Sequence, residues 1–191
     1  MSPSGYFGRE YGSEHHRLWC RTTRAHNAVL VNGEGQDMTG REPGPADPVC
    51  RIVSCSDEGE RKTAVLDLSA AYPSLELWRR TLILEAGRLT VTDEIDGREE
   101  VEITWPIHTL SRPEADGNAV RITRRGVSMR AEPAEGGLVL SEILDRFPVD
   151  LNAGQPAAYH VTMPQQFHVF WRTERKRHHR ITVVMTVSAD Q

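Results

Sequence analysis

Apolar and polar residues alternate along most of the chain, which is the pattern of β-strands that bury one face. Apolar residues occupy every second position in three runs: Val101–Ile107, Phe167–Trp171 and Ile181–Val187. Turn signals recur at short intervals between such runs, which favours antiparallel strands over βαβ units. We therefore predict an all-β fold, a two-layer antiparallel β-sandwich with little helix. The side chains predicted to point inward are Val101, Ile103, Trp105, Phe167, Val169, Trp171, Val183 and Met185.

Glycine, proline and charged residues mark the expected turns and loops. The expected turns lie at Asn32–Gly35, Glu85–Arg88, Asp96–Gly97 and Asp116–Asn118. A short helix is expected within Ala70–Arg80, where Pro73 limits its length. Residues 35–48 are rich in proline and glycine and are expected to form an exposed loop. The basic run Glu174–Arg180 is expected at a solvated hairpin tip, with a contact to an anionic polymer as the alternative.

Length, charge and cysteine content narrow the class of protein. The 191 residues are enough for one substantial core, and we expect a single domain over 1–191. The formal net charge of −4 argues against a protein that coats nucleic acid. No apolar run is long enough for a membrane span, and the first residues lack the pattern of a signal peptide. Three cysteines cannot form a full disulfide framework, and Cys50 and Cys55 lie on opposite faces of an expected strand.

Aromatic and imidazole side chains gather near the N-terminus, where we expect residues 1–25 to form an irregular arm that lines a cleft. Tyrosine and histidine can transfer protons, and neutral histidine is the commonest protein ligand for metals. A second interpretation stays open, in which His15 and His16 are surface loop residues and His26 is hydrogen-bonded at the start of a strand. The sequence contains no HxH or HExxH metal motif. The candidate side chains are Tyr6, Tyr11, His15, His16, His26 and Asn27.

A further candidate is His108, which follows the alternating run Val101–Ile107. It either faces a cleft or has a structural role, as a single histidine at the end of a strand usually does. The sequence alone does not choose between these two interpretations.

Five motifs occur in order along the chain: Thr23–Gln36 with its Ala-His-Asn triplet, Asp67–Tyr72, Arg79–Leu82, Val91–Ile95 and Trp105–Thr109. In this order they resemble the motifs of the C-terminal β-sandwich domain of the heparinase II/III-like polysaccharide lyases. The resemblance extends from about Tyr6 to the last expected strand.

This resemblance implies cleavage of uronic-acid polysaccharides, such as glycosaminoglycans or alginate, by β-elimination. In similar lyases the active site lies in a groove between the sandwich and an N-terminal (α/α) helical toroid. His26 matches one of three zinc ligands of the zinc-containing members. A tyrosine that transfers protons is best matched by Tyr6 and alternatively by Tyr11. The candidates for substrate binding are His15, His16 and Asn27.

The chain also departs from the family pattern. The toroid and the other two zinc ligands, a His and an Asp, lie upstream of Met1 in that pattern. We therefore expect the sandwich part of a lyase, inactive alone, with zinc bound tightly only in a longer protein. The expected partners are an acidic polysaccharide and the toroid domain or another chain. The alternative function is a non-catalytic acidic-glycan-binding or structural accessory module. The resemblance implies a secreted or periplasmic location.

Overall fold

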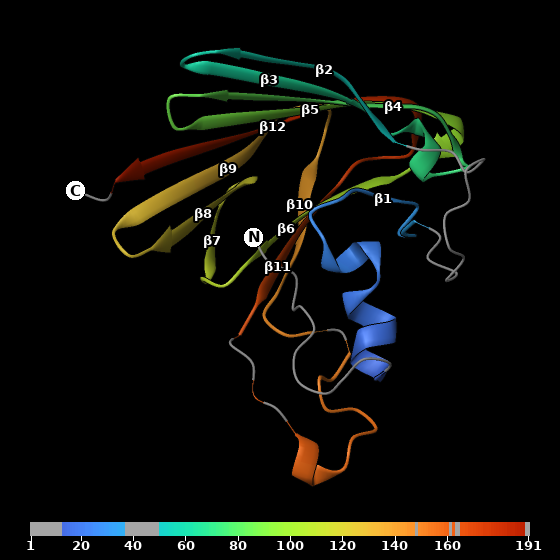
Figure 1. Ribbon diagram of the computed structural model, residues 1–191, viewed down its shortest axis with the longest axis vertical. Helices are drawn as coiled ribbons and strands as arrows, with labels where there is room; N and C mark the ends of the chain where they lie inside the picture. The colour runs from blue at the N-terminus through green and yellow to red at the C-terminus, as the bar shows by residue number, and fades with distance from the viewer. Residues whose placement is uncertain (1–12, 37–49, 148, 161, 163–164, 190–191) are drawn as a thin grey trace.

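Two antiparallel β-sheets of unequal size face each other (Figure 1). The computed structural model describes residues 13–36, 50–147, 149–160, 162 and 165–189. The large sheet consists of β2 (Arg51–Glu58), β3 (Arg61–Asp67), β4 (Leu75–Glu85), β5 (Arg88–Val101), β7 (Pro113–Asp116), β8 (Ala119–Arg124), β9 (Val127–Glu135) and β12 (Lys176–Ala189). The small sheet consists of β1 (Leu30–Val31), β6 (Ile103–Thr109), β10 (Val139–Leu144) and β11 (Phe167–Arg172).

The spatial order of the strands is β2-β3-β4-β5-β12-β9-β8-β7 in the large sheet and β1-β6-β11-β10 in the small sheet. This arrangement confirms the predicted all-β, two-layer antiparallel sandwich. Neighbouring strands that follow each other in sequence are joined by tight turns, as at β4–β5 and β8–β9.

Helical structure among the described residues is limited to short turns. They are the π-helical η1 (His16–Cys20) and the 3₁₀ turns η2 (Thr23–Ala25), η3 (Ser69–Ala71) and η4 (Ala157–Tyr159). The helix expected within Ala70–Arg80 is therefore correct only at its start, because the chain becomes strand β4 from Leu75. In the part of the chain that the structure covers, no helix is long and apolar enough to cross a membrane.

Two of the points at which the chain crosses from one sheet to the other are joined by hydrogen bonds. The run Val101–Ile107, predicted as one strand, is divided at Glu102 into the end of β5 and the start of β6. The second change lies between β11 and β12. There the Thr173 amide donates to the Ile103 carbonyl oxygen (3.0 Å), and the Ile103 amide donates to Thr173 Oγ1 (3.0 Å). These two hydrogen bonds continue the pairing of β6 with β11 and hold the two crossing segments together.

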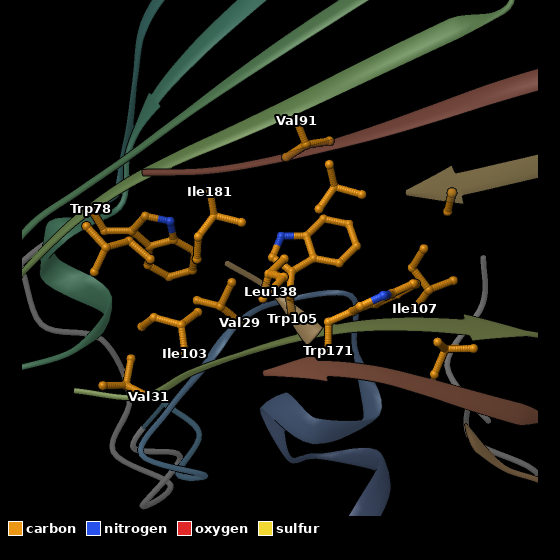
Figure 2. Packing of buried hydrophobic residues seen from close by; sticks show 14 of the residues in the cluster. Val29, Val31, Trp78, Val91, Ile103, Trp105, Ile107, Leu138, Trp171 and Ile181 are labelled. Atoms are coloured by element: carbon orange, nitrogen blue, oxygen red, sulfur yellow. The ribbon is translucent and has the colours of Figure 1, made fainter. Parts of the chain in front are cut away.

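The core lies between the two sheets, and Figure 2 shows aromatic and β-branched side chains from both sheets meeting there. Trp78 of β4 is 1% exposed, and Trp105 and Trp171 of the small sheet contact each other edge to face. All eight side chains predicted to point inward are buried, and all except Phe167 belong to the cluster between the sheets. The alternation in the sequence therefore predicted the facing of these strands correctly.

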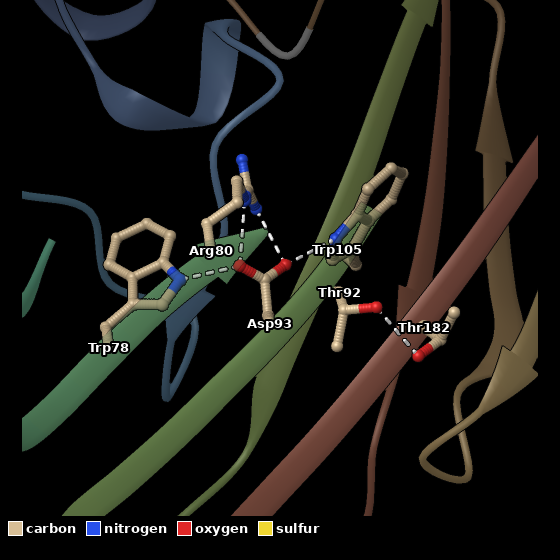
Figure 3. A network of polar contacts seen from close by, with 6 residues as sticks. All are labelled: Trp78, Arg80, Thr92, Asp93, Trp105 and Thr182. Carbon is tan, nitrogen blue, oxygen red and sulfur yellow. Dashed lines mark hydrogen bonds and ion pairs between the residues drawn. The ribbon is translucent and has the colours of Figure 1, made fainter. Parts of the chain in front are cut away.

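A buried carboxylate also lies between the sheets. Asp93 of β5 is fully buried and accepts hydrogen bonds from both indole groups and the guanidinium that Figure 3 shows around it. Trp78 Nε1 (2.7 Å) and Arg80 Nε (2.7 Å) donate to Oδ1, whereas Arg80 Nη2 (2.8 Å) and Trp105 Nε1 (3.1 Å) donate to Oδ2. Since Trp105 belongs to the small sheet, this network joins the two layers through polar contacts.

The turn predictions are confirmed at Asn32–Gly35, Glu85–Arg88 and Asp116–Asn118 but are wrong at Asp96–Gly97. The Asp96–Gly97 pair lies inside β5, and the register of both neighbouring strands shifts beside it. A Cβ atom at Gly97 would lie 2.4 Å from the Glu99 carbonyl oxygen. Glycine is therefore required here by a close backbone approach and not by a turn.

The prediction of a hairpin tip over Glu174–Arg180 is also wrong, although six of these seven residues are exposed as expected. Residues 176–180 begin β12 and pair with the end of β5, in the middle of the large sheet. His179 is buried, and its Nε2 nitrogen donates to the Val101 carbonyl oxygen (2.9 Å). On the exposed face, His178 Nδ1 lies 2.8 Å from Asp96 Oδ1. The backbone of this charged run thus pairs with β5 while its side chains other than that of His179 remain exposed.

The outer face of the small sheet is covered as well as its inner face. Residues 13–25, the described part of the arm expected over 1–25, form the turns η1 and η2 beside β6 and β11 (Figure 1). Trp19 of η1 is 1% exposed and contacts the ring of His168 at 4.9 Å between centroids. This cover explains why six of the seven residues of β6, Ile103–His108, are all buried. Of the loop expected over 35–48, residues 37–48 lie outside the described residues.

Candidate functional site

Two histidines face each other on the covered outer side of the small sheet. His108 of β6 and His168 of β11 are directly opposite in the strand register, and their Nδ1 atoms lie 2.8 Å apart. The two residues are 3% and 0% exposed. Trp19 covers both rings edge to face, and Phe170 contacts His108 from the side. This pair therefore lies in an apolar, water-poor environment.

Burial shifts the protonation of both rings. Desolvation lowers the pKa of His108 to about 4, although the carbonyl oxygen of His26 opposes the shift. Desolvation also lowers the pKa of His168 to about 4, with smaller contributions from His108 and the Arg24 guanidinium. Both imidazoles are consequently neutral at pH 7, so that each ring has one N–H donor and one acceptor nitrogen.

The loop between η2 and β1 carries His26 and Asn27 at the rim of this cluster. Both side chains are exposed. The Nε2–H of His108 donates to the His26 carbonyl oxygen (3.1 Å), and the His108 backbone amide donates to Asn27 Oδ1 (3.0 Å). The His26 amide in turn donates to the carbonyl oxygen of Thr23 (3.0 Å). The exposed imidazole of His26 is thus attached to a backbone whose amide and carbonyl groups are both hydrogen-bonded.

The strand that follows this loop is also held in place. The hydroxyl of Tyr72 donates to the Val29 carbonyl oxygen (2.5 Å), and burial raises the pKa of Tyr72 to about 12, which keeps the hydroxyl protonated. After the Asn32–Gly33 turn, the Gln36 amide donates to Thr23 Oγ1 (2.8 Å). Both ends of the Thr23–Gln36 segment therefore meet beside η2.

The other candidates from the sequence are placed as follows. His15 and His16 are each 3% exposed, so the interpretation of them as surface loop residues is wrong. His15 Nδ1–H donates to the Val149 carbonyl oxygen (3.0 Å), and its ring contacts Phe147 edge to face at 5.0 Å. Desolvation lowers the pKa of His16.

The two tyrosine candidates and a metal cluster cannot be placed in the same way. Tyr6 and Tyr11 lie outside the described residues. Within the residues that are described, no group of three His, Cys, Asp or Glu side chains could hold a metal ion. His26 therefore belongs to no such group, and the described residues do not fit a zinc site by themselves. The three cysteines are free thiols.

Sequence reasoning gave no role to His168 or Arg24. Arg24 lies with its guanidinium over the Phe170 ring at 5.5 Å. A signal for His168 was present in the run Phe167–Trp171, which is apolar on both strand faces except at this histidine. Such continuous apolar runs are typical of strands buried on both sides, which places the histidine in an interior.

The neutral histidine pair leads to a prediction about stability and pH. In the unfolded chain a histidine takes up its proton near pH 6.5, but His108 and His168 do so only near pH 4 in the folded protein. Between these values the unfolded state binds more protons, so the free energy of unfolding should fall as the pH decreases through this window. Each pKa unit of depression corresponds to about 1.4 kcal/mol per group. Urea unfolding at a series of pH values measures this dependence.

The other basic residues that act on the pair are Arg24 and His26, so variants are needed to assign the effect. We expect His168→Asn to reduce the slope between pH 6.5 and 4, whereas His160→Gln, at an exposed position, should leave it unchanged. Ring resonances of His108 and His168 that titrate near pH 6.5 in the folded protein would contradict the prediction.

Comparison with known proteins supports the family suggested by the motifs. A sequence model described as heparinase II/III-like, C-terminal, matches residues 3–179. A search of curated proteins gives no significant match.

The fold is similar to parts of solved lyase structures. A heparan sulfate lyase, HepC from Pedobacter heparinus, has 15% identity and a TM-score of 0.74 over 100% of this chain and 29% of that chain. A heparinase III has 15% identity and a TM-score of 0.73 over 100% of this chain and 28% of that chain. A second heparinase III structure has 16% identity and a TM-score of 0.62 over 94% of this chain and 26% of that chain. The chain therefore spans less than a third of the length of these structures. The family model matches most of this chain, which therefore belongs to the heparinase II/III-like, C-terminal family.

Proposed function

We propose that this chain is the β-sandwich part of a lyase that cleaves uronic-acid polysaccharides by β-elimination, and that it needs a helical domain from outside this chain for turnover. The observation that carries this proposal is the His26–Asn27 rim. The triplet that resembles the family motif is the one that exposes an imidazole and a carboxamide on a fixed backbone. Family membership supports the reaction class, and the share of the solved relatives that the chain spans supports a shared site.

β-Elimination requires three kinds of group. A base removes the proton next to the uronate carboxylate, an acid protonates the departing glycosidic oxygen, and polar groups neutralise the carboxylate. Asn27 suits the third task, because its Oδ1 accepts from His108 and its amide nitrogen can donate to a carboxylate oxygen. We propose Tyr6, or alternatively Tyr11, for proton transfer, and His15 and His16 for substrate binding through rearrangement of the η1 segment.

His26 is the one described residue that we propose as a zinc ligand. The described residues offer one ligand, and a stable zinc site needs three or four. We propose that His26 completes a zinc site whose other ligands come from outside the described residues. Bound zinc would order the rim and polarise an oxygen ligand. The proton transfers are carried out by side chains of the protein.

An eliminase assay tests the proposed function. The unsaturated uronate product absorbs in the ultraviolet, so a panel of uronate polymers can be screened with the chain alone and with any longer gene product that includes a helical region upstream of Met1. We expect no turnover by the chain alone and turnover by the longer protein. Tight binding of acidic polysaccharide by the chain, with no cleavage by either protein, would contradict the lyase proposal and indicate a glycan-binding module.

The His26→Ala substitution gives the sharpest prediction for the rim. Because the side chain is exposed and its backbone contacts remain, the free energy of unfolding of this chain should change by less than about 0.5 kcal/mol. In the longer protein the same substitution should abolish both zinc binding, measured by titration calorimetry, and lyase activity. His160→Ala, at another exposed histidine, serves as the control and should change neither. Equal zinc affinity of the longer protein with and without His26→Ala would contradict the assignment of His26 as a zinc ligand.

A further inference from the structure

His108 makes three hydrogen bonds that together connect the sheet to the rim loop. Its ring and its backbone amide hold two consecutive residues, His26 through the carbonyl oxygen and Asn27 through the carboxamide oxygen. The other ring nitrogen of His108 lies 2.8 Å from His168 Nδ1, on the neighbouring strand. The ring of His108 is thus fixed from both sides, and its two nitrogens are both used.

These partners determine where the protons lie. A carbonyl oxygen can only accept, so His108 must carry its proton on Nε2. In the neutral ring the Nδ1 atom of His108 is then an acceptor. The hydrogen bond between the two Nδ1 atoms therefore requires His168 to donate from Nδ1. The reverse arrangement would place a lone pair of His108 against the His26 carbonyl oxygen, which is repulsive.

The state of His168 agrees with this assignment. With its proton on Nδ1, the Nε2 atom of His168 is an unprotonated acceptor. This atom is buried and has no hydrogen-bond partner among the residues that the structure describes. Trp19 lies against the same ring at 4.9 Å between centroids, and Phe147 at 5.6 Å. Among the described residues, the hydrogen bond that orders the His168 ring is the one to His108.

We propose that His108 and His168 are positioning residues for the rim. Each ring is locked in one neutral tautomer, His108 protonated on Nε2 and His168 on Nδ1, and the two rings together set the place of the His26–Asn27 backbone. The role of this positioning rests on the proposed function, in which the His26–Asn27 rim contacts substrate or metal. The chemistry is that of an oriented hydrogen-bond relay which ends at the carbonyl oxygen of His26.

The tautomers can be measured on the unmodified chain. Long-range proton–nitrogen correlation spectra at pH 7 distinguish the two neutral forms of each histidine. We expect one fixed Nε2–H ring at His108 and one fixed Nδ1–H ring at His168, without averaging between forms. An Nδ1–H tautomer at His108, or rapid exchange between tautomers at either ring, would overturn the proposal without the need for any variant.

Matched substitutions test whether the pair positions the rim. Gln at position 108 keeps a donor near the place of Nε2, and Asn at position 168 keeps one near the place of Nδ1, whereas leucine at either position removes the donor. We expect His108→Leu and His168→Leu to change the amide shifts of His26 and Asn27 and to raise amide exchange at His108 by about tenfold, the effect of losing one ordinary hydrogen bond. His108→Gln and His168→Asn should restore most of the native behaviour. Leucine variants that fold and leave the rim amides unchanged would contradict the proposed positioning role.

The readouts separate this inference from the proposed function. Tautomers, amide shifts and amide exchange are measured without zinc and without polysaccharide. A longer protein with no lyase activity would therefore remove the proposed function and leave the positioning inference standing. Conversely, a wrong tautomer in an active lyase would remove only the inference. His178→Gln, at a histidine of β12 paired with Asp96 on the large sheet, is the control variant.

Discussion

Asp93→Asn should lower the free energy of unfolding by about 3–5 kcal/mol, the effect expected when one partner of a buried ion pair is removed. The carboxylate is fully buried and receives four hydrogen bonds, two on each oxygen (Figure 3). Whichever oxygen the amide group of asparagine replaces, its N–H groups would face two donors. The Arg80 guanidinium, 13% exposed, would also lose its counter-charge.

Urea denaturation at pH 7 measures this loss, with the unchanged m-value as a check on two-state unfolding. Glu94→Gln is the matched control, because Glu94 is the next residue of β5 and pairs with Arg180 on the exposed face. Such exposed pairs contribute about 0–1 kcal/mol. A loss below about 1 kcal/mol for Asp93→Asn would show that the network adapts to a neutral side chain.

The sequence predicted the layers of the fold because alternation is a local signal. Trp105 and Trp171 alternate with residues of the other face, and both are buried as expected. The errors arose where local composition conflicts with long-range pairing. Asp96–Gly97 is typical of a turn, but both neighbouring strands pair with it in β5. The charged run before Arg180 likewise belongs to β12 because it pairs with β5. The composition of the run alone does not reveal this partner strand.

The candidate site was predictable to a different extent. The Ala-His-Asn triplet identified His26 and Asn27, which are exposed at the rim. His108 was noticed, but its partner His168 lies 60 residues away in sequence, and only the pairing of β6 with β11 brings the two rings together. His15 and His16 are buried because η1 covers the small sheet, and their local sequence does not predict that contact. Long-range strand register is therefore what the sequence reasoning lacked.

Trp105→Ala is the second substitution with a large expected effect. The indole is 5% exposed, contacts Trp171 at 6.2 Å between ring centroids, and donates to Asp93. Removal of a buried aromatic side chain costs about 3–5 kcal/mol, because the lost contacts leave a cavity that the neighbours fill only partly. Urea denaturation again provides the measurement. Leu110→Ala, at a 43% exposed leucine just after β6, should cost less than about 0.5 kcal/mol.

Trp105→Phe separates packing from the hydrogen bond. Phenylalanine keeps most of the aromatic volume of Trp105 but has no N–H for Asp93 Oδ2, whose remaining donor is Arg80 Nη2. In a double-mutant cycle with Asp93→Asn, the two losses should fall short of additivity by about 0.5–3 kcal/mol, as is usual for residues in one network. This coupling would show that the carboxylate between the sheets stabilises their contact directly. Strict additivity would instead mean that Trp105 contributes through packing alone, and that Asp93 is held within the large sheet by Trp78 and Arg80.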